Sequence, residues 1–172
     1  MHKITTLNDL YIQELSNLYN AEERILKILP LMAANVYSAE LKETLENHFE
    51  QTQLHLERLE KVFRNKGINP LRRKCAVMEG LVEEGKSVLR TSAEPLIKDI
   101  AIISHTKKIE HYEIAGYGCA VAQAKVLGEF ENQDILQATL DEEIESEEIL
   151  TEIAEDTLTN NAIEEWEEEQ VL

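Results

Sequence analysis

Apolar residues recur at three- and four-residue spacing along four long stretches of this chain, and this period restricts its fold more than any other feature. In the first stretch they form a single stripe: Leu7, Tyr11, Leu15, Leu18, Ile25, Leu29 and Met32. A stripe of this period follows one face of an α-helix and differs from the two-residue alternation of a strand. Only three prolines and six glycines interrupt the 172 residues. The sequence therefore predicts an all-α protein.

Five helices are expected from the stripes and from the residues that start and stop them. A cap signal at Thr5 and Thr6 begins the first, which is expected to reach about Tyr37 with a kink or break at Pro30, near Leu29. The other four are expected at about 38–66, 75–89, 94–127 and 132–158.

Four glycines have expected roles in these helices. Gly67 and Gly128 follow the second expected helix and the third long one, where they suit the residue just past a helix end. Gly116 and Gly118 lie inside the third long helix, where they would let a neighbouring helix approach closely at a cost in helix propensity.

The connection over residues 69–94 is long and contains a helix of its own. An up-down-up-down bundle needs only short loops, so four long helices with one helical crossover between the second and third predict a ferritin-like four-helix bundle. We expect residues 1–158 to form this bundle. The acidic residues 159–172 are expected to form a tail, or a short helix docked through Ile163 and Trp166.

The charge of the chain limits its partners. It carries 17 basic and 34 acidic residues, a formal charge of −17, which repels nucleic acid and anionic membranes. The N-terminus lacks the apolar core of a signal peptide, and no stretch approaches the roughly 18 apolar residues of a membrane span. Cys75 and Cys119 lie in no motif, which argues against a secreted disulfide scaffold. These observations predict a cytoplasmic protein with neither nucleic acid nor membrane as a partner.

Several polar side chains fall on helix faces that should be apolar. They are Glu22 in the first long helix, His48, Thr52 and His55 in the second, Glu110 and His111 in the third, and Glu143, Ser146 and Glu147 in the fourth. Gln51 lies at the margin of its face. Tyr112 and Glu113 fall outside the stripe of the third long helix and are expected at the surface or at an interface. A carboxylate buried alone is very costly, so the inward glutamates require a common explanation.

Two divalent metal ions would balance the four inward carboxylates, and His55 or His111 would add nitrogen ligands. An alternative stays open, because Lys107 also faces inward and would pair with the two glutamates of the fourth long helix. His48, beside Thr52, suits a hydrogen-bonded core histidine better than a ligand.

Three stretches carry a resemblance to a known family: HFEQTQLHLERLEKVF, KCAVMEGLVEEG and IEHYEIAGYG, with YNAEERI upstream and TLDEEIESEE downstream. Over residues 4–158 the chain resembles the bacterial YciE/YciF family of ferritin-like stress-response proteins. The resemblance implies a ferritin-like bundle that associates as a homodimer. Relatedness to rubrerythrin and the ferritins implies a dinuclear iron or manganese site.

Carried over by position, the resemblance implies metal ligands at Glu22, Glu110, Glu143 and Glu147. Family members commonly read His-x-Glu-Glu-Thr on the second helix, with a carboxylate where this chain has Gln51. A neutral amide is a poor ligand. The site is therefore expected to hold metal more weakly, to hold one ion rather than two, or to use His55 one turn later.

Two functions remain open at this point. One is a metal-dependent oxidoreductase of peroxidase, catalase or ferroxidase type, with peroxide, dioxygen or ferrous iron as its small-molecule substrate. No rubredoxin-type cysteine pair accompanies it, so a peroxidase of this kind would need a separate electron donor. The other is a non-catalytic dimeric stress or scaffold protein whose inward polar groups form a structural hydrogen-bond network. A storage cage is a weaker third option.

Overall fold

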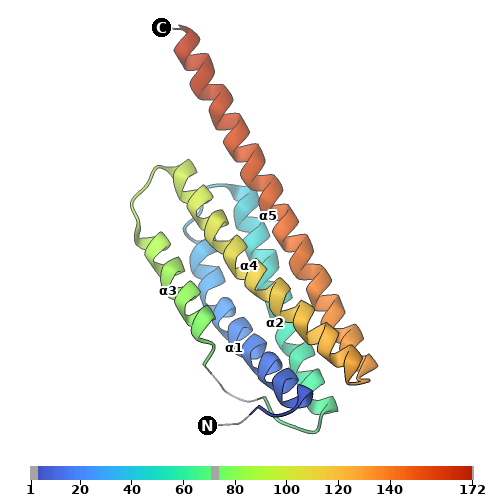
Figure 1. Cartoon of the computed structure of the whole chain (residues 1–172). Coiled ribbons are helices and arrows are strands. Elements are labelled where there is room, and N and C mark those ends of the chain that lie inside the picture. Colours follow the sequence, from blue (N-terminus) through green and yellow to red (C-terminus); the bar gives the residue numbers. More distant parts are fainter. Residues whose placement is uncertain (1–3, 71–73, 172) are drawn as a thin grey trace.

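The computed structural model describes residues 4–70 and 74–171, with side chains as far as residue 158, and in these residues it contains helices and no strands. The helices are α1 (Leu7–Ala33), α2 (Ala39–Asn65), α3 (Ala76–Arg90), α4 (Pro95–Val126) and α5 (Phe130–Val171). Helices α1, α2, α4 and α5 form the bundle, and α3 packs on the outer side of α1 and α4 (Figure 1). The predicted all-α bundle with a helical crossover between its second and third long helices is confirmed.

Local interactions explain where the helices start and stop. A capping box begins α1, in which the Asp9 amide donates to Thr6 Oγ1 at 3.1 Å and the Thr6 amide donates to Asp9 Oδ2 at 3.0 Å. Just past the ends of α2 and α4, Gly67 and Gly128 have φ angles of 68° and 74°. Glycine adopts this left-handed conformation without the steric cost that a side chain brings. The expected role of both glycines is confirmed.

The end of α1 differs from the expectation. The helix does not break near Leu29 and does not reach Tyr37, but ends at Ala33. Pro30 therefore lies in its last turn, where the Pro30 carbonyl still accepts a hydrogen bond of 3.1 Å from the Ala34 amide. A proline in a helix removes one hydrogen bond and crowds the carbonyl of the preceding turn, yet the residues after Pro30 remain helical as far as Ala33.

Helix α5 is longer than expected at both ends. It begins at Phe130 and continues to Val171, and its C-terminal part extends past the ends of the other helices (Figure 1). The division of the chain into a bundle at 1–158 and a tail at 159–172 stays a prediction, and the side chains of Ile163 and Trp166 lie outside the described ones.

The apolar core is divided into two clusters along the bundle. One includes Ile25, Leu45, Met78, Ile103 and Leu150. The other includes Leu18, Leu59, Phe63, Tyr117 and Leu136. Between them, every bundle helix contributes buried polar side chains: Glu22 from α1, His48, Thr52 and His55 from α2, Glu110 and Glu113 from α4, and Glu143 and Ser146 from α5. We call this the polar layer.

Close packing of α1 on α4 depends on one glycine. A Cβ atom at Gly116 would lie 2.8 Å from Leu18 Cδ2 and 3.3 Å from Glu14 Oε1, which is closer than ordinary packing allows. At Gly118 a Cβ would meet nothing within 4 Å. The expected close approach is therefore found at Gly116 and not at Gly118.

The sequence predicted neither a membrane span nor a disulfide scaffold. None of the helices in that part of the chain is long and apolar enough to cross a membrane. Cys75 and Cys119 are free thiols. Cys75 Sγ accepts a hydrogen bond of 3.4 Å from the Met78 amide and so caps α3.

Candidate metal centre

The polar layer brings four carboxylates and two imidazoles together. The set is Glu22, His48, His55, Glu110, Glu113 and Glu143, and all six side chains are buried. They form two groups, and within each group the ligand atoms lie within 4.8 Å of one another. We call the first group the His55 position; it consists of Glu22, His55 and Glu143. We call the second the His48 position; it consists of His48, Glu110, Glu113 and Glu143. Glu143 belongs to both groups, so its carboxylate is placed to bridge two ions.

The His55 position lies between α1, α2 and α5. Nδ1 of His55 is 3.0 Å from Glu143 Oε1 and 3.5 Å from Glu22 Oε1. The Tyr117 hydroxyl, from α4, donates a hydrogen bond to Glu22 Oε1. Its ring meets the His55 imidazole edge-on, with the ring centroids 6.4 Å apart. Tyr117 thus contacts both Glu22, through its hydroxyl, and His55, through its ring.

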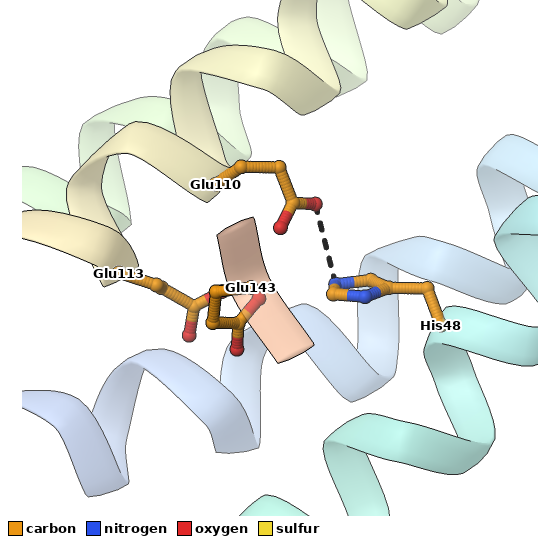
Figure 2. Close-up of side chains that lie close together, drawn as sticks. All are labelled: His48, Glu110, Glu113 and Glu143. Carbon is orange, nitrogen blue, oxygen red and sulfur yellow. Dashed lines mark ion pairs between the residues drawn. The ribbon is translucent and has the colours of Figure 1, made fainter. Parts of the chain in front are cut away.

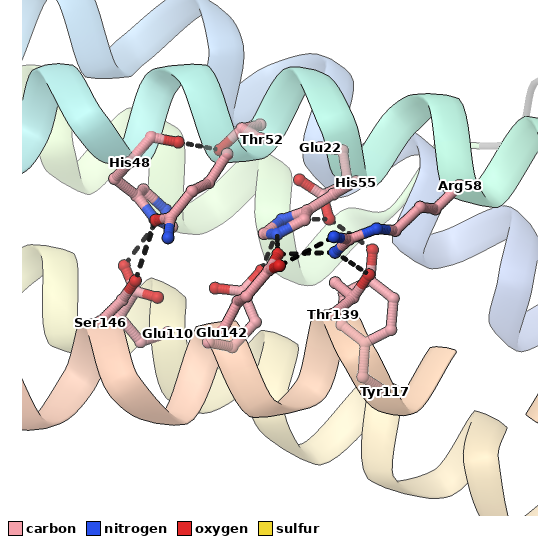
Figure 3. Close-up of polar contacts among 12 residues, drawn as sticks. Glu22, His48, Thr52, His55, Arg58, Glu110, Tyr117, Thr139, Glu142 and Ser146 are labelled. Carbon is pink, nitrogen blue, oxygen red and sulfur yellow. Dashed lines mark hydrogen bonds and ion pairs between the residues drawn. The ribbon is translucent and has the colours of Figure 1, made fainter. Parts of the chain in front are cut away.

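The other ring nitrogen of His55 contacts a further carboxylate, that of Glu142. Nε2 of His55 is 2.8 Å from Glu142 Oε2. Arg58 donates two hydrogen bonds to the same carboxylate, from Nη1 to Oε2 at 2.6 Å and from Nη2 to Oε1 at 2.8 Å (Figure 3). With Nε2 engaged by Glu142, Nδ1 is directed at the polar layer. Histidine ligands of metal ions are commonly oriented by a carboxylate on the other ring nitrogen, as His55 is here.

The His48 position is shown in Figure 2, with Glu110 and Glu113 on α4, Glu143 on α5 and His48 on α2. Nε2 of His48 lies 3.3 Å from Glu110 Oε1. On its other side, His48 Nδ1 lies 3.4 Å from Ser146 Oγ. Both oxygens of Glu110 and both oxygens of Glu113 lack a hydrogen-bond partner.

Burial and mutual contact shift the pKa values of these groups in opposite directions. Burial raises the pKa of Glu110 and of Glu113 well above the usual value, and neighbouring carboxylates raise it further. Burial alone would lower the pKa of His55, but the carboxylates of Glu143 and Glu22 raise it to about 11. Burial would raise the pKa of Glu143, yet the neighbouring imidazoles hold it below its usual value. In the absence of metal the layer therefore retains protons near neutral pH.

The donor atoms of this layer fit a pair of divalent cations. Each of the four glutamates has at least one buried carboxylate oxygen with neither a hydrogen bond nor an ion-pair contact. Such an atom costs about 1–3 kcal/mol when it is left unpaired. Four ionised carboxylates carry the charge that two divalent ions neutralise, and carboxylate with imidazole is a donor set suited to iron or manganese.

Four of the seven ligands expected from the sequence lie in these two groups: Glu22, His55, Glu110 and Glu143. Gln51 is half-buried at the edge of the layer, where its Oε1 lies 3.4 Å from Ser146 Oγ, the donor. It does not belong to either group. The assignment of all seven as ligands stays a prediction.

Glu147 and His111 meet at the surface edge between α4 and α5. The Lys107 ammonium is 3.0 Å from Glu147 Oε1, and His111 Nε2 is 3.6 Å from the same oxygen. The His111 side chain is 64% exposed. The ion pair with Lys107, expected as an alternative for both glutamates of α5, therefore forms with Glu147. Glu143 instead faces the imidazole of His55.

Two residues of the candidate set were not expected as ligands from the sequence: Glu113, which was placed outside, and His48, which was correctly placed inside but as a hydrogen-bonded core histidine. Glu113 was placed at the surface or an interface, and this is wrong, because its side chain is 0% exposed. Tyr112, placed with it, is half-buried. His48 was interpreted as a core histidine, yet its Nε2 faces Glu110. The three-residue spacing of Glu110 and Glu113, which places both on one helix face, is the signal that could have identified Glu113.

The layer also departs from a common ligand pattern. Dinuclear carboxylate bundles carry a Glu from each of two helices and a Glu-x-x-His pair from each of the other two. In this chain the windows Thr52–His55 and Glu143–Ser146, TQLH and EIES, each retain one of the two ligands. His48 and Glu110 bring a second imidazole and a fourth carboxylate to the same layer. Thr52 on α2 and Ser146 on α5 therefore stand where the pattern has a glutamate and a histidine. His48 on α2 and Glu110 on α4 supply an imidazole and a carboxylate from other positions.

Comparison with known proteins places the chain in a family. Residues 6–163 match the model of a family described as a domain of unknown function, DUF892. Over 158 residues, 91% of this chain and 95% of the relative, it is 32% identical to protein YciF of Escherichia coli strain K12. The chain belongs to the YciE/YciF family. The resemblance found in the sequence is confirmed.

Solved structures of similar proteins share the fold. The crystal structure of the E. coli stress protein YciF aligns with a TM-score of 0.88 at 32% identity, over 91% of this chain and 99% of that one. YcfI of Rhodopseudomonas palustris aligns at 0.83 and 34% identity, over 87% and 96%. A ferritin-like, diiron-carboxylate protein of Bacillus anthracis aligns at 0.68 and 18% identity, over 88% and 99%. The ferritin-like fold is thereby confirmed.

Proposed function

We propose that this YciE/YciF family protein holds two divalent iron or manganese ions in its polar layer and uses them to process peroxide, dioxygen or ferrous iron. One observation carries the proposal. Six buried residues from all four bundle helices bring carboxylate oxygens and imidazole nitrogens into two groups that share Glu143, and within each group the ligand atoms lie within 4.8 Å of one another. An apolar bundle has no structural need for four carboxylates in one layer, whereas a pair of cations needs such a set.

The side chains of the layer have distinct roles in this proposal. Glu143 bridges the two positions, and Glu22 and His55 complete the first of them. Tyr117 and Glu142 orient those two ligands through the hydroxyl and carboxylate contacts described above. The apolar clusters on either side exclude bulk water, which strengthens electrostatic interactions within the layer. Two ferrous ions held by these residues would supply the two electrons that, with two protons, reduce one peroxide to two water molecules.

The relatives lend the proposal partial support. The Bacillus anthracis neighbour is a diiron-carboxylate protein on the same fold, and E. coli YciF is a stress protein. We extend a role in bacterial stress to this chain on the strength of its 32% identity to YciF. Homodimer formation and a cytoplasmic location belong to the same proposal and rest on the family resemblance and the sequence.

A non-catalytic scaffold is the second candidate, and one observation favours it. His55 contacts both Glu22 and Glu143 and so offsets part of their charge without any metal. Gln51, which replaces a carboxylate common in the family, removes a further charge. Against this reading, the side chains that the structure describes place no comparable cation beside Glu113, whose two oxygens lack hydrogen-bond partners.

Anaerobic loading separates the two candidates. The purified full chain is stripped with chelator, loaded with Fe²⁺, freed of excess iron and then mixed with hydrogen peroxide. The dinuclear proposal predicts oxidation of two ferrous ions for each peroxide consumed, together with a higher melting temperature in the loaded protein, because a ligand that binds only the native state stabilises it. An unchanged melting temperature and no bound iron would support the scaffold and refute the metal centre. Glu143→Ala is the variant expected to lose both responses.

A further inference from the structure

Hydrogen-bond support differs between the two positions of the polar layer. At the His55 position, two ligands are fixed from outside. Tyr117 donates to Glu22, and Glu142 engages His55. Glu142 is itself held by Arg58 through two contacts of 2.6 and 2.8 Å. This half of the layer is therefore ordered by contacts that do not depend on a metal ion.

The His48 position lacks comparable support. Among the described residues, none donates a hydrogen bond to Glu110 or Glu113, and Glu110 Oε1 has only the 3.3 Å contact with His48 Nε2, within the position itself. His48 is supported by one residue that belongs to neither position, through a long contact of 3.4 Å between its Nδ1 and Ser146 Oγ. Ser146 divides its contacts between His48 and Gln51, which is also 3.4 Å away.

This difference has a consequence for binding. Hydrogen-bond partners behind the ligands of a metal site typically change its affinity by about 10–100-fold. Ligands that are already oriented lose little conformational entropy when an ion binds, whereas unsupported glutamates must first be ordered. Both positions share Glu143, so the difference between them arises from the side chains that they do not share.

We propose that the two positions bind divalent cations unequally: the His55 position keeps a resident ion, and the His48 position takes up and releases a second, exchangeable one. The proposal rests on the function proposed above and deepens it. It assigns the exchangeable cation to His48, Glu110 and Glu113. This cation is a divalent transition-metal ion, the class of substrate that a ferroxidase takes up. At low metal supply the protein would carry one ion per chain.

Cobalt(II) titration of the stripped full-length protein tests this proposal, with visible absorption and calorimetry as readouts. We expect two binding steps whose dissociation constants differ by about 10–100-fold. His48→Ala should abolish the weaker step and leave the tighter one within error. Tyr117→Phe should weaken the tighter step and bring the two steps closer together. Glu145→Gln, at an exposed glutamate of α5 that belongs to neither position, is the matched control and should change neither step.

Several outcomes would overturn the inference. Two steps of equal affinity, or loss of the tighter step in His48→Ala, would contradict unequal positions while leaving the two-ion centre in place. If His48→Ala fails to fold by circular dichroism, Glu113→Gln replaces it, since the amide has nearly the same shape and should also remove only the weaker step. Absence of any cobalt binding in the wild-type chain would instead refute the proposed function itself.

Discussion

Nε2 of His55 lies 2.8 Å from Oε2 of Glu142, and this contact aims the other ring nitrogen of His55 into the polar layer. Glu142 is itself held by Arg58, so an arginine, a glutamate and a histidine form a chain from the surface to the buried carboxylates. Because α2 and α5 supply these residues, the orientation of the imidazole depends on the packing of the two helices. A bundle that holds metal here would lose affinity if any member of the chain were removed.

Glu142→Gln is expected to weaken metal binding at the His55 position. The neutral amide keeps the shape of the side chain but attracts neither Arg58 nor the imidazole strongly, and loss of such a partner typically lowers affinity by about 10–100-fold. Competitive titration against a chelator of known affinity measures the change. Glu145→Gln, at an exposed glutamate of α5, is the control. Equal affinities in the two variants would show that Glu142 does not orient a ligand.

Metal affinity is expected to rise with pH. Burial raises the pKa of Glu110 and of Glu113, and the carboxylates of Glu143 and Glu22 raise the pKa of His55 to about 11. These groups hold protons that a cation must displace, so affinity should increase with pH by up to about tenfold per pH unit for each proton released, until the pH passes the pKa of about 11 of His55.

Proton release can be measured directly. Addition of Mn²⁺ to the stripped protein in weak buffer, with an indicator dye, should acidify the solution by at least one proton per ion. No acidification, together with an affinity that does not change with pH, would mean that the shifted groups are not the ligands.

Gly116→Ala is expected to destabilise the bundle. The added methyl would lie 2.8 Å from Leu18 Cδ2 and 3.3 Å from Glu14 Oε1, so either the fully buried Leu18 side chain or the two helices must shift, at a cost of about 1–3 kcal/mol in the free energy of unfolding. Gly118→Ala on the same helix meets nothing within 4 Å and should stabilise by about 0.5–1 kcal/mol through helix propensity. Urea denaturation of both variants gives the comparison. A matching loss of stability in the two would show that the close approach at Gly116 is not needed.

Lys98→Met should loosen the end of the crossover helix. Lys98 Nζ donates to the carbonyl oxygens of Val88, Leu89 and Thr91 at 2.8, 2.7 and 2.9 Å, where α3 ends. Removing a charged donor from these carbonyls should lower the free energy of unfolding by about 1.5–3 kcal/mol. Amide hydrogen exchange should show the largest loss of protection in α3. Lys108→Met, which removes an exposed ion pair with Glu84, is expected to have little effect.

The sequence predicted the side chains best where a helix buries one narrow face. On α1, the stripe through Leu18, Ile25 and Leu29 is fully buried, and Glu22 between them is buried as expected. The same reasoning correctly placed Glu143 inward on α5. Local chemistry was equally informative at Gly67, where the left-handed turn ends α2.

Prediction failed on α4 because much of its buried face is polar or small, as at Glu113 and Gly116, so the apolar residues alone do not mark the face. Ile114 and Val121, two apolar residues of this helix, are only half-buried. The assumed face was rotated toward one edge, and this placed His111 inside and Glu113 outside.

Glu147 illustrates a different limit. Its spacing from Glu143 is one helical turn, so both were expected in the site. The helix period cannot show which partner from another helix each will meet, and the ammonium of Lys107 lies 3.0 Å from Glu147. Partner choice of this kind depends on the register of α4 against α5, which no local pattern contains.

The number of divalent ions bound per chain tests the central claim most directly. Wild-type protein and Glu143→Ala, stripped and then reconstituted with Fe²⁺ or Mn²⁺, are compared by elemental analysis after removal of free metal. The dinuclear centre predicts two ions per wild-type chain and a clear loss in Glu143→Ala, because this carboxylate belongs to both positions. A wild-type chain that holds no stoichiometric metal, or a Glu143→Ala variant that holds as much as the wild type, would contradict it.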